Sequence, residues 1–176
     1  MIGVVQLSFL KNTKIDSAKT AQNVKDFFEH EFDHYLNLSG KHRSDLSSPK
    51  MDITGITAHN GINHQDESMA VNIDADNCVL AVDHTISSCS NSGEKPYGTI
   101  LYLSYIKNIS NYAIAQRLGY QTTRYYELKN RALVEFAERM ELYRKRDHTS
   151  IEDLRIFEDE EQGKFQKRTM SEVRAK

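Results

Sequence analysis

The densest helical pattern in the chain lies between residues 97 and 146, where apolar side chains recur at steps of three and four. In the second half of this stretch they fall on one side of a helix that turns about 100° per residue. They are Tyr125, Leu128, Ala132, Phe136, Met140 and Tyr143. A single apolar stripe of this kind has to pack against other elements. Because the other periodic segments are helical as well, the sequence predicts an all-α fold.

Residues 15 to 38 predict a second long helix, near the N-terminus. Asp16 is the expected N-cap, because a short side-chain oxygen accepts hydrogen bonds from the free N–H groups of the first turn. Gly40 is expected to end the helix in the left-handed conformation. The apolar stripe of this helix consists of Ala21, Val24, Phe28, Phe32 and Tyr35. It suits packing on the rest of the chain or pairing with a second copy, so a homodimer is an open alternative.

Composition and periodicity divide the chain into four parts. Residues 1–40 are expected to form an N-terminal helical segment, and residues 41–68 a flexible linker rich in Ser, Gly, Asn, Asp and His. Residues 69–146 are expected to form a helical domain. Residues 147–176 are a charged tail that we expect to be partly disordered, with residues 150–153 either capping a short helix or fraying.

The net charge is -2, but the charged residues are distributed unevenly along the chain. Residues 1–98 carry 8 basic and 13 acidic residues, whereas residues 99–146 carry 9 basic and 4 acidic ones. A positive segment within a mildly acidic chain is typical of a surface that faces phosphate groups. The same charges also suit an ordinary solvated helix face.

The composition is that of a soluble protein rather than a membrane protein. The mean hydropathy is -0.63, and no apolar run approaches the roughly 18 residues of a membrane helix. No basic residues precede the apolar stretch 1–10, as they would in a secretory signal, so we expect a cytoplasmic protein. Cys78 and Cys89 are too few for a disulfide framework and lack the CxxC spacing of a zinc knuckle.

The segment from Ser110 to Leu128 has the pattern of a helix-turn-helix. Such a motif needs a small residue where two helices cross, which Ala115 supplies. It also needs a turn residue that tolerates positive φ, and Gly119 does so without steric cost. The apolar anchors with suitable spacing are Ile114, Leu118, Tyr125 and Leu128. We therefore predict a helix-turn-helix at about residues 110–140, with an ordinary helical hairpin as the alternative.

The second helix of this motif presents a polar face opposite its apolar stripe, as a helix in the major groove of DNA does. On that helix we expect Arg124, Lys129 and Arg131 to contact phosphates. Asn130 is a candidate for pairing with adenine. The candidates for contact with base edges are Thr122, Thr123, Tyr126 and Glu127. The expected partner is double-stranded DNA.

A competing pattern is His30-Glu31-Phe32-Asp33-His34, which matches the H-E-x-x-H motif of zinc metalloproteases. On a helix the two histidines would lie one turn apart, with Glu31 as a general base. Charged residues flank the motif, however, and no third ligand follows at a suitable spacing. The sequence also has no Gly-rich phosphate loop and no G-x-S-x-G elbow. We therefore expect no catalytic residues, no metal and no cofactor.

Several short motifs resemble known families of DNA-binding proteins. Leu118-Gly119-Tyr120, Arg124 and Arg131-Ala132-Leu133 resemble the helix-turn-helix of region four in bacterial primary sigma factors. More broadly, residues 7 to 143 resemble the ArpU family of phage-encoded transcriptional regulators, found in prophages of Gram-positive bacteria. The motifs behind this resemblance are Asn23-Val24-Lys25-Asp26-Phe27-Phe28, Ser48-Pro49-Lys50-Met51-Asp52, Leu103-Ser104-Tyr105-Ile106 and Arg124-Tyr125-Tyr126-Glu127-Leu128-Lys129 with Ala132-Leu133.

The resemblance implies an activator of late phage genes, the class that covers packaging, structural and lysis functions. It implies promoter DNA as the partner in the cytoplasm of a bacterial host, with host RNA polymerase as a further candidate. A complete sigma factor also needs an aromatic-rich segment that melts promoter DNA, and the upstream residues offer none. A sigma-like factor is therefore the weaker alternative, and an adaptor that does not bind DNA is another.

Overall fold

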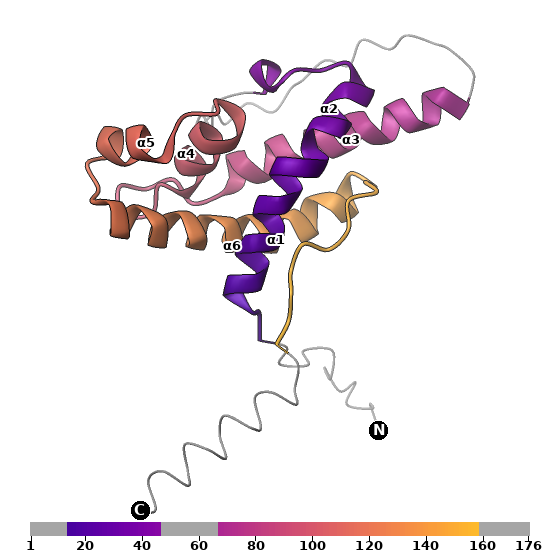
Figure 1. Ribbon diagram of the computed structural model, residues 1–176. Coiled ribbons are helices and arrows are strands. Elements are labelled where there is room, and N and C mark those ends of the chain that lie inside the picture. The colour runs from indigo at the N-terminus through magenta and orange to yellow at the C-terminus, as the bar shows by residue number, and fades with distance from the viewer. Residues whose placement is uncertain (1–13, 47–66, 159–176) are drawn as a thin grey trace, which may run out of the picture.

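The computed structural model describes residues 14–46 and 67–158 (Figure 1). The regular elements in these ranges are helices, which confirms the all-α prediction, together with two isolated β-bridges. In chain order they are α1 (Ser17–Asp26), the π-helical turn η1 (Phe27–Glu31), α2 (Phe32–Ser39), the 3-10 turn η2 (Arg43–Asp45), α3 (Glu67–Ser88), α4 (Tyr97–Leu101), the π-helical turn η3 (Tyr102–Ile106), α5 (Asn111–Leu118) and α6 (Thr122–Arg146). Most of the expected linker and the end of the expected tail lie outside the described residues.

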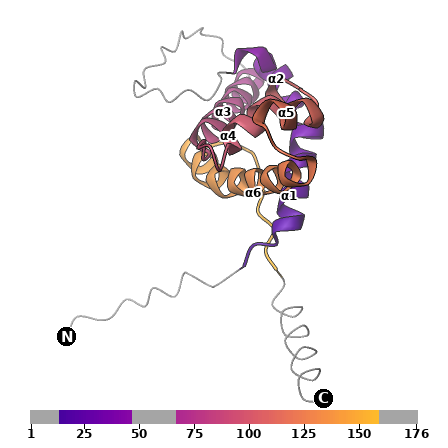
Figure 2. The same ribbon diagram turned by 90° about the vertical axis from the view of Figure 1, so that its left-hand side faces the viewer.

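Helices α3 and α6 lie side by side and run in opposite directions. In the last third of α6, the Thr85 hydroxyl lies 3.2 Å from the sulfur of Met140. Nearer the start of α6, the N–H of Ser90 donates to the Glu135 carboxylate at 2.8 Å. In Figure 1 the first helix crosses in front of both, and Figure 2 shows it upright beside α6. None of the described helices has the length and apolarity that a membrane span needs.

One hydrophobic core joins the N-terminal helix to the C-terminal helices. The apolar stripe expected on α6 is confirmed, because its members from Tyr125 to Met140 are at most 1% exposed and Tyr143 is half-buried. The stripe of the first helix is likewise buried, apart from the half-buried Tyr35. Because this stripe packs inside the core, it is not available for pairing with a second copy of the chain. A homodimer through another surface stays a prediction.

The first helix is interrupted by the π-helical turn η1, which its sequence period did not predict. In this turn the N–H of Phe32 bonds to the carbonyl of Phe27, five residues earlier. The extra residue in the turn places Phe27 and Phe28 both in the core, each 1% exposed. The Phe28 ring stacks on Tyr105, in the second π-helical turn, with centroids 4.4 Å apart and planes 13° from parallel.

The side chain of Arg43 connects the two π-helical turns. Its guanidinium donates to the carbonyl of Phe28 at 3.2 Å and to the carbonyl of Tyr105. It also donates to the Asp33 carboxylate at 2.9 Å, and its carbon lies 5.2 Å from the centre of the Phe32 ring. Arg43 therefore supplies a donor to one carbonyl of each π-helical turn.

Both ends of the first helix are capped as predicted. The Asp16 carboxylate accepts from the N–H of Lys19 at 3.0 Å, and Gly40 adopts a left-handed conformation with φ 66°. Residues 150–153 form neither the short helix nor the frayed end that the sequence suggested. Instead Ile151 and Leu154 are 2% and 6% exposed, because this segment runs extended along α1 and joins the core.

Replacing Arg43 should lower the free energy of unfolding, because two carbonyls lose their donor. We expect Arg43→Met to cost about 2 kcal/mol in a denaturant titration. Arg43→Lys should recover only part of this, since one ammonium does not span both carbonyls. Lys19→Met, which removes an exposed ion pair with Asp16, should stay within about 0.5 kcal/mol of the parent. Equal losses in the arginine and lysine variants would contradict the bridging role.

Candidate nucleic-acid interface

Helices α5 and α6 are joined by a three-residue turn with the geometry of a helix-turn-helix. Gly119 has φ 73°, and its N–H donates to the carbonyl of Gln116 at 3.1 Å. The N–H of Tyr120 donates to the carbonyl of Ala115 at 2.9 Å, which completes a Schellman-type helix end. The Tyr120 hydroxyl then donates to the carbonyl of Gly93 at 2.8 Å. This bond ties the turn to the loop that precedes α4.

The residues expected to anchor the motif face the core. Ile114 and Ala115 on α5 are 0% and 4% exposed, and Leu118 is half-buried. Tyr125 and Leu128 on α6 are 0% and 1% exposed. At the start of α5, Ser110 is an N-cap whose hydroxyl accepts from the N–H of Ala113 at 3.4 Å. The small side chain of Ala115 and the turn at Gly119 therefore occupy the places that the motif requires.

The structure places most of the expected DNA-contacting residues on one solvent-exposed face of α6. The exposed members are Thr122, Thr123, Arg124, Tyr126, Glu127, Asn130 and Arg131. The Gln121 side chain makes no cap to α6. The first N–H groups of a helix have no partners within it, so the first turn of α6 has donors available for an anion. The exposed face and this uncapped end lie at the same end of the helix.

Two of the exposed side chains are already paired with each other. The Arg124 guanidinium donates to the Glu127 carboxylate at 3.0 Å, and the two side chains are 48% and 52% exposed. An exposed pair of this kind contributes only about 0–1 kcal/mol. Either side chain is therefore free to exchange its partner for a group on DNA at small cost.

Lys129 is the one expected residue that lies elsewhere. It is half-buried, and its ammonium donates to the side-chain oxygen of Asn111 at 2.9 Å while lying 4.7 Å from the centre of the Tyr105 ring. The same oxygen of Asn111 accepts from the Tyr125 hydroxyl at 3.0 Å. Burial, together with the nearby charge of Lys25, lowers the pKa of Lys129 to about 8. Lys129 thus links α5 to α6 rather than projecting from the exposed face.

Sequence reasoning missed the contribution of α5 to the exposed surface. Tyr112 is 69% exposed, and its hydroxyl accepts from the side-chain amide of Gln116 at 2.7 Å. Arg117, on the same helix, and Lys107, just before it, are exposed and make no ion pair within the described ranges. Applying the angular analysis to α5 as well as to α6 would have predicted this exposure.

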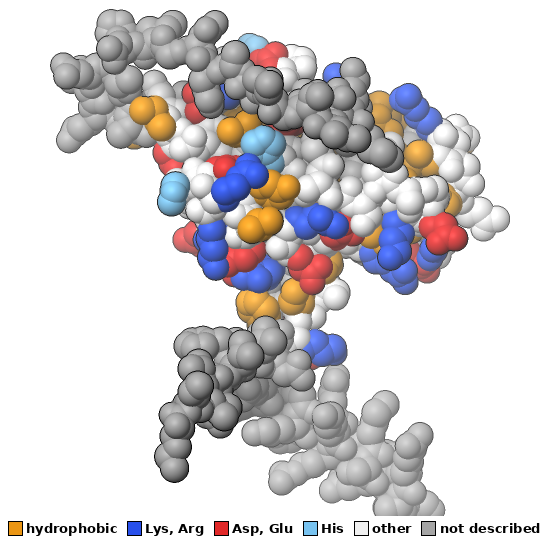
Figure 3. Space-filling view, turned by 180° about the vertical axis from the view of Figure 1, so that it is seen from behind, with side chains coloured by type: hydrophobic (Ala, Val, Ile, Leu, Met, Phe, Trp, Pro, Cys, Tyr) orange, Lys and Arg blue, Asp and Glu red, His pale blue; other side chains and the backbone are white. Residues whose placement is uncertain are grey.

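The basic balance of residues 99–146 is partly neutralised by ion pairs. In the second half of α6 the cations pair with nearby carboxylates, as Arg139 does with Glu135 at 2.7 Å. The other paired cations there are Arg144, Lys145 and Arg146. On the face seen in Figure 3, acidic and basic side chains are intermixed. Unpaired positive charge near the motif therefore comes from Lys107, Arg117 and Arg131 within the described ranges.

The metalloprotease pattern does not assemble a set of metal ligands in the described residues. The group of three candidate ligands that lies within reach there is Asp26, Glu29 and His30, and all three are exposed. His34 is not part of it. The π-helical turn runs through His30 and changes the helical register on which the H-E-x-x-H geometry depends.

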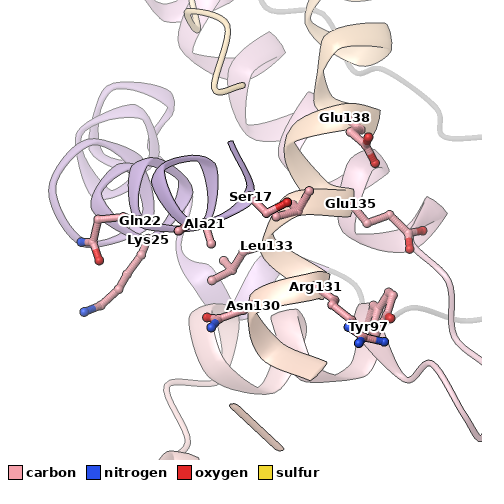
Figure 4. A pocket seen from close by; sticks show the side chains of 12 residues that line it. Ser17, Ala21, Gln22, Lys25, Tyr97, Asn130, Arg131, Leu133, Glu135 and Glu138 are labelled. Atoms are coloured by element: carbon pink, nitrogen blue, oxygen red, sulfur yellow. The ribbon is translucent and has the colours of Figure 1, made fainter. Parts of the chain in front are cut away.

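A groove of about 640 Å³ runs between α1 and α6, beside the exposed face (Figure 4). Lys25 and Gln22 project from α1 on one side, and Asn130 and Arg131 from α6 on the other. Leu133 lies between the two helices, so the groove has an apolar floor and polar edges. Asn130 and Arg131 thus belong both to the exposed face and to this groove.

Searches against models of protein families, against curated proteins and against solved structures found no match to this chain. The ArpU resemblance therefore stands on the motifs of the chain alone.

The left-handed conformation of Gly119 predicts a specific cost of substitution. No atom lies within 4 Å of a Cβ built at this position, so the cost comes from the backbone conformation alone. Gly119→Ala should lower the free energy of unfolding by about 1–2 kcal/mol. Gly119→Asn should cost less, because asparagine tolerates positive φ. If both variants unfold like the parent in a urea titration, the turn does not require this conformation.

Proposed function

We propose that this chain is a sequence-specific DNA-binding regulator of transcription that inserts the first turns of α6 into the major groove. The observation that carries the proposal is the division of α6 into two faces. The core-facing stripe from Tyr125 to Met140 is buried, whereas the polar side chains from Thr122 to Arg131, apart from Lys129, are exposed beside a helix-turn-helix turn. A recognition helix needs this arrangement, because its buried stripe fixes the orientation of the side chains that meet the bases.

The exposed residues suit different kinds of contact. Arg131 is exposed and unpaired within the described ranges, so it is suited to a phosphate. Glu127 is suited to accept from a cytosine amino group once it leaves Arg124. Tyr126, which is 46% exposed, is suited to pack against a thymine methyl group. Arg117 and Lys107 add positive charge close to the same surface.

The biological setting that we propose comes from the ArpU resemblance. It favours an activator of late phage genes that binds promoter DNA in a bacterial host, with host RNA polymerase as a candidate partner. An adaptor that does not bind DNA is the main competing function. It predicts that the chain enriches no sequence from a random pool of DNA duplexes.

Arg131→Ala should weaken binding to all DNA sequences by a similar factor. Selection from a random duplex pool would first supply a ligand, and gel-shift titrations at several salt concentrations would then give the salt dependence of affinity. Loss of one phosphate contact should reduce the slope of log K against log salt by about one. Lys145→Ala is the matched control, since Lys145 lies at the far end of α6 and pairs with Glu141 at 2.5 Å. An unchanged slope for Arg131→Ala would remove this residue from the interface.

Glu127→Ala should instead change which sequence is preferred. We expect discrimination at one base pair to fall by about 1–3 kcal/mol, measured by repeating the selection and by competition with single-base variants. Glu138→Ala, an exposed carboxylate farther along α6, should leave the preferred sequence unchanged. An unaltered preference in the Glu127 variant would show that this side chain does not meet a base.

A further inference from the structure

Lys129 lines a cavity of about 470 Å³ between the start of α5 and the first helix, and so do Asn111 and Tyr105, which its amine contacts. The walls come from six helical elements and the loop before α5, so the cavity is a feature of the tertiary fold. Its lining includes Phe28, Glu29, Asp33, Arg43, Tyr105 and Asn111 in addition to Lys129. This cavity lies away from the exposed face of α6 and has no role in the DNA contacts proposed above.

The contacts of Lys129 are unusual for a lysine. Its amine meets the neutral side-chain oxygen of Asn111 and the face of the Tyr105 ring, and no carboxylate pairs with it within the described ranges. The Tyr105 hydroxyl is itself buried without a hydrogen-bond partner there. The amine is therefore held in place by weak, neutral partners, and it is not masked by an ion pair.

The charged groups around the amine come from the first helix and the turn after it. Burial is the main cause that lowers the pKa of Lys129 to about 8, with a further decrease from Lys25 and an opposing increase from Glu29. Asp33 and Arg43 also line the cavity and pair with each other at 2.7 Å. The two carboxylates and two cations of the lining balance while the amine is protonated, and the lining carries one net negative charge once the amine is neutral.

We propose that Lys129 is a modification site, the preferred acceptor in this chain for the acyl group of small acyl phosphates. The neutral amine attacks the carbonyl carbon of the donor. A C–N bond forms, the bond between that carbon and the phosphate oxygen breaks, and inorganic phosphate leaves. The amine loses a proton to water, and the product is an amide.

Two properties of the site favour this reaction. At pH 7 a lysine with a pKa of about 8 holds roughly 200 times more neutral amine than one at the ordinary value of about 10.4. The cavity also leaves room for a donor of a few heavy atoms beside Lys129, although Lys129 is half-buried.

Acylation removes the cation above Tyr105 and the ammonium donor to Asn111, both of which support the start of α5. Weaker DNA binding is the consequence if the proposed function holds.

The test uses the full chain, acetyl phosphate and peptide mapping by mass spectrometry, without DNA. Lys107, which is exposed, is the internal reference. At pH 7 Lys129 should be acetylated at least tenfold faster than Lys107, and its rate should level off above about pH 8. A rate at Lys129 no greater than that at Lys107, or one that rises without levelling through pH 9.5, would overturn the proposal. Because no DNA is present, these outcomes are independent of the proposed function.

Two variants and one condition test whether the fold creates this reactivity. Glu29→Gln should shift the levelling of the Lys129 rate to lower pH, and Lys25→Gln should shift it to higher pH, because their charges act in opposite directions. Both residues are exposed, so the variants should fold. In denaturant the ratio of the two rates should fall to about one. A ratio that persists after unfolding would show that the cavity is not the cause.

Discussion

The guanidinium of Arg43 is the contact on which the arrangement of the two halves depends. It bridges the carbonyls of Phe28 and Tyr105, from two π-helical turns that lie far apart in the sequence, and the rings of these two residues stack on each other. The amine of Lys129 lies over the ring of Tyr105 and donates to the side chain of Asn111 at the start of α5. A chain of direct contacts thus leads from the N-terminal helix to the first helix of the helix-turn-helix.

This chain of contacts divides the residues of α6 into those on its exposed side and those that pack on the rest of the protein. Residues on its exposed side are free to meet a ligand, and the ion pair that Arg124 and Glu127 form there is a weak surface pair. Residues on its inner side set the angle at which α5 and the turn are held. Lys129 belongs to the second group although it lies only two positions from Glu127. Position along α6 therefore does not by itself assign a residue to the proposed DNA contact.

Local spacing was sufficient to predict the helical stripes, the caps at Asp16 and Gly40, and the turn at Gly119. Each depends on residues within a few positions of one another, so a sequence contains the necessary information. The π-helical turns, the bridging role of Arg43 and the buried site of Lys129 depend on partners from distant segments. The sequence did not predict that Ile151 and Leu154 join the core, because two apolar residues among charged ones give little periodic signal and their partners lie in a distant segment. The angular analysis placed Thr123, Arg124, Tyr126, Glu127, Asn130 and Arg131 on or beside the exposed face of the helix, and all six are exposed.

The pairing of Ile15 with Phe157 brings together the two ends of the described core. Helix α1 packs on α6 and on the segment that follows it, more than 100 residues later in the chain. During synthesis α1 is made long before α6, and the apolar residues that α1 packs on α6 stay uncovered until α6 has left the ribosome. Closure of the core is therefore a late, long-range step, and folding should be slower than for a helical bundle of neighbouring elements.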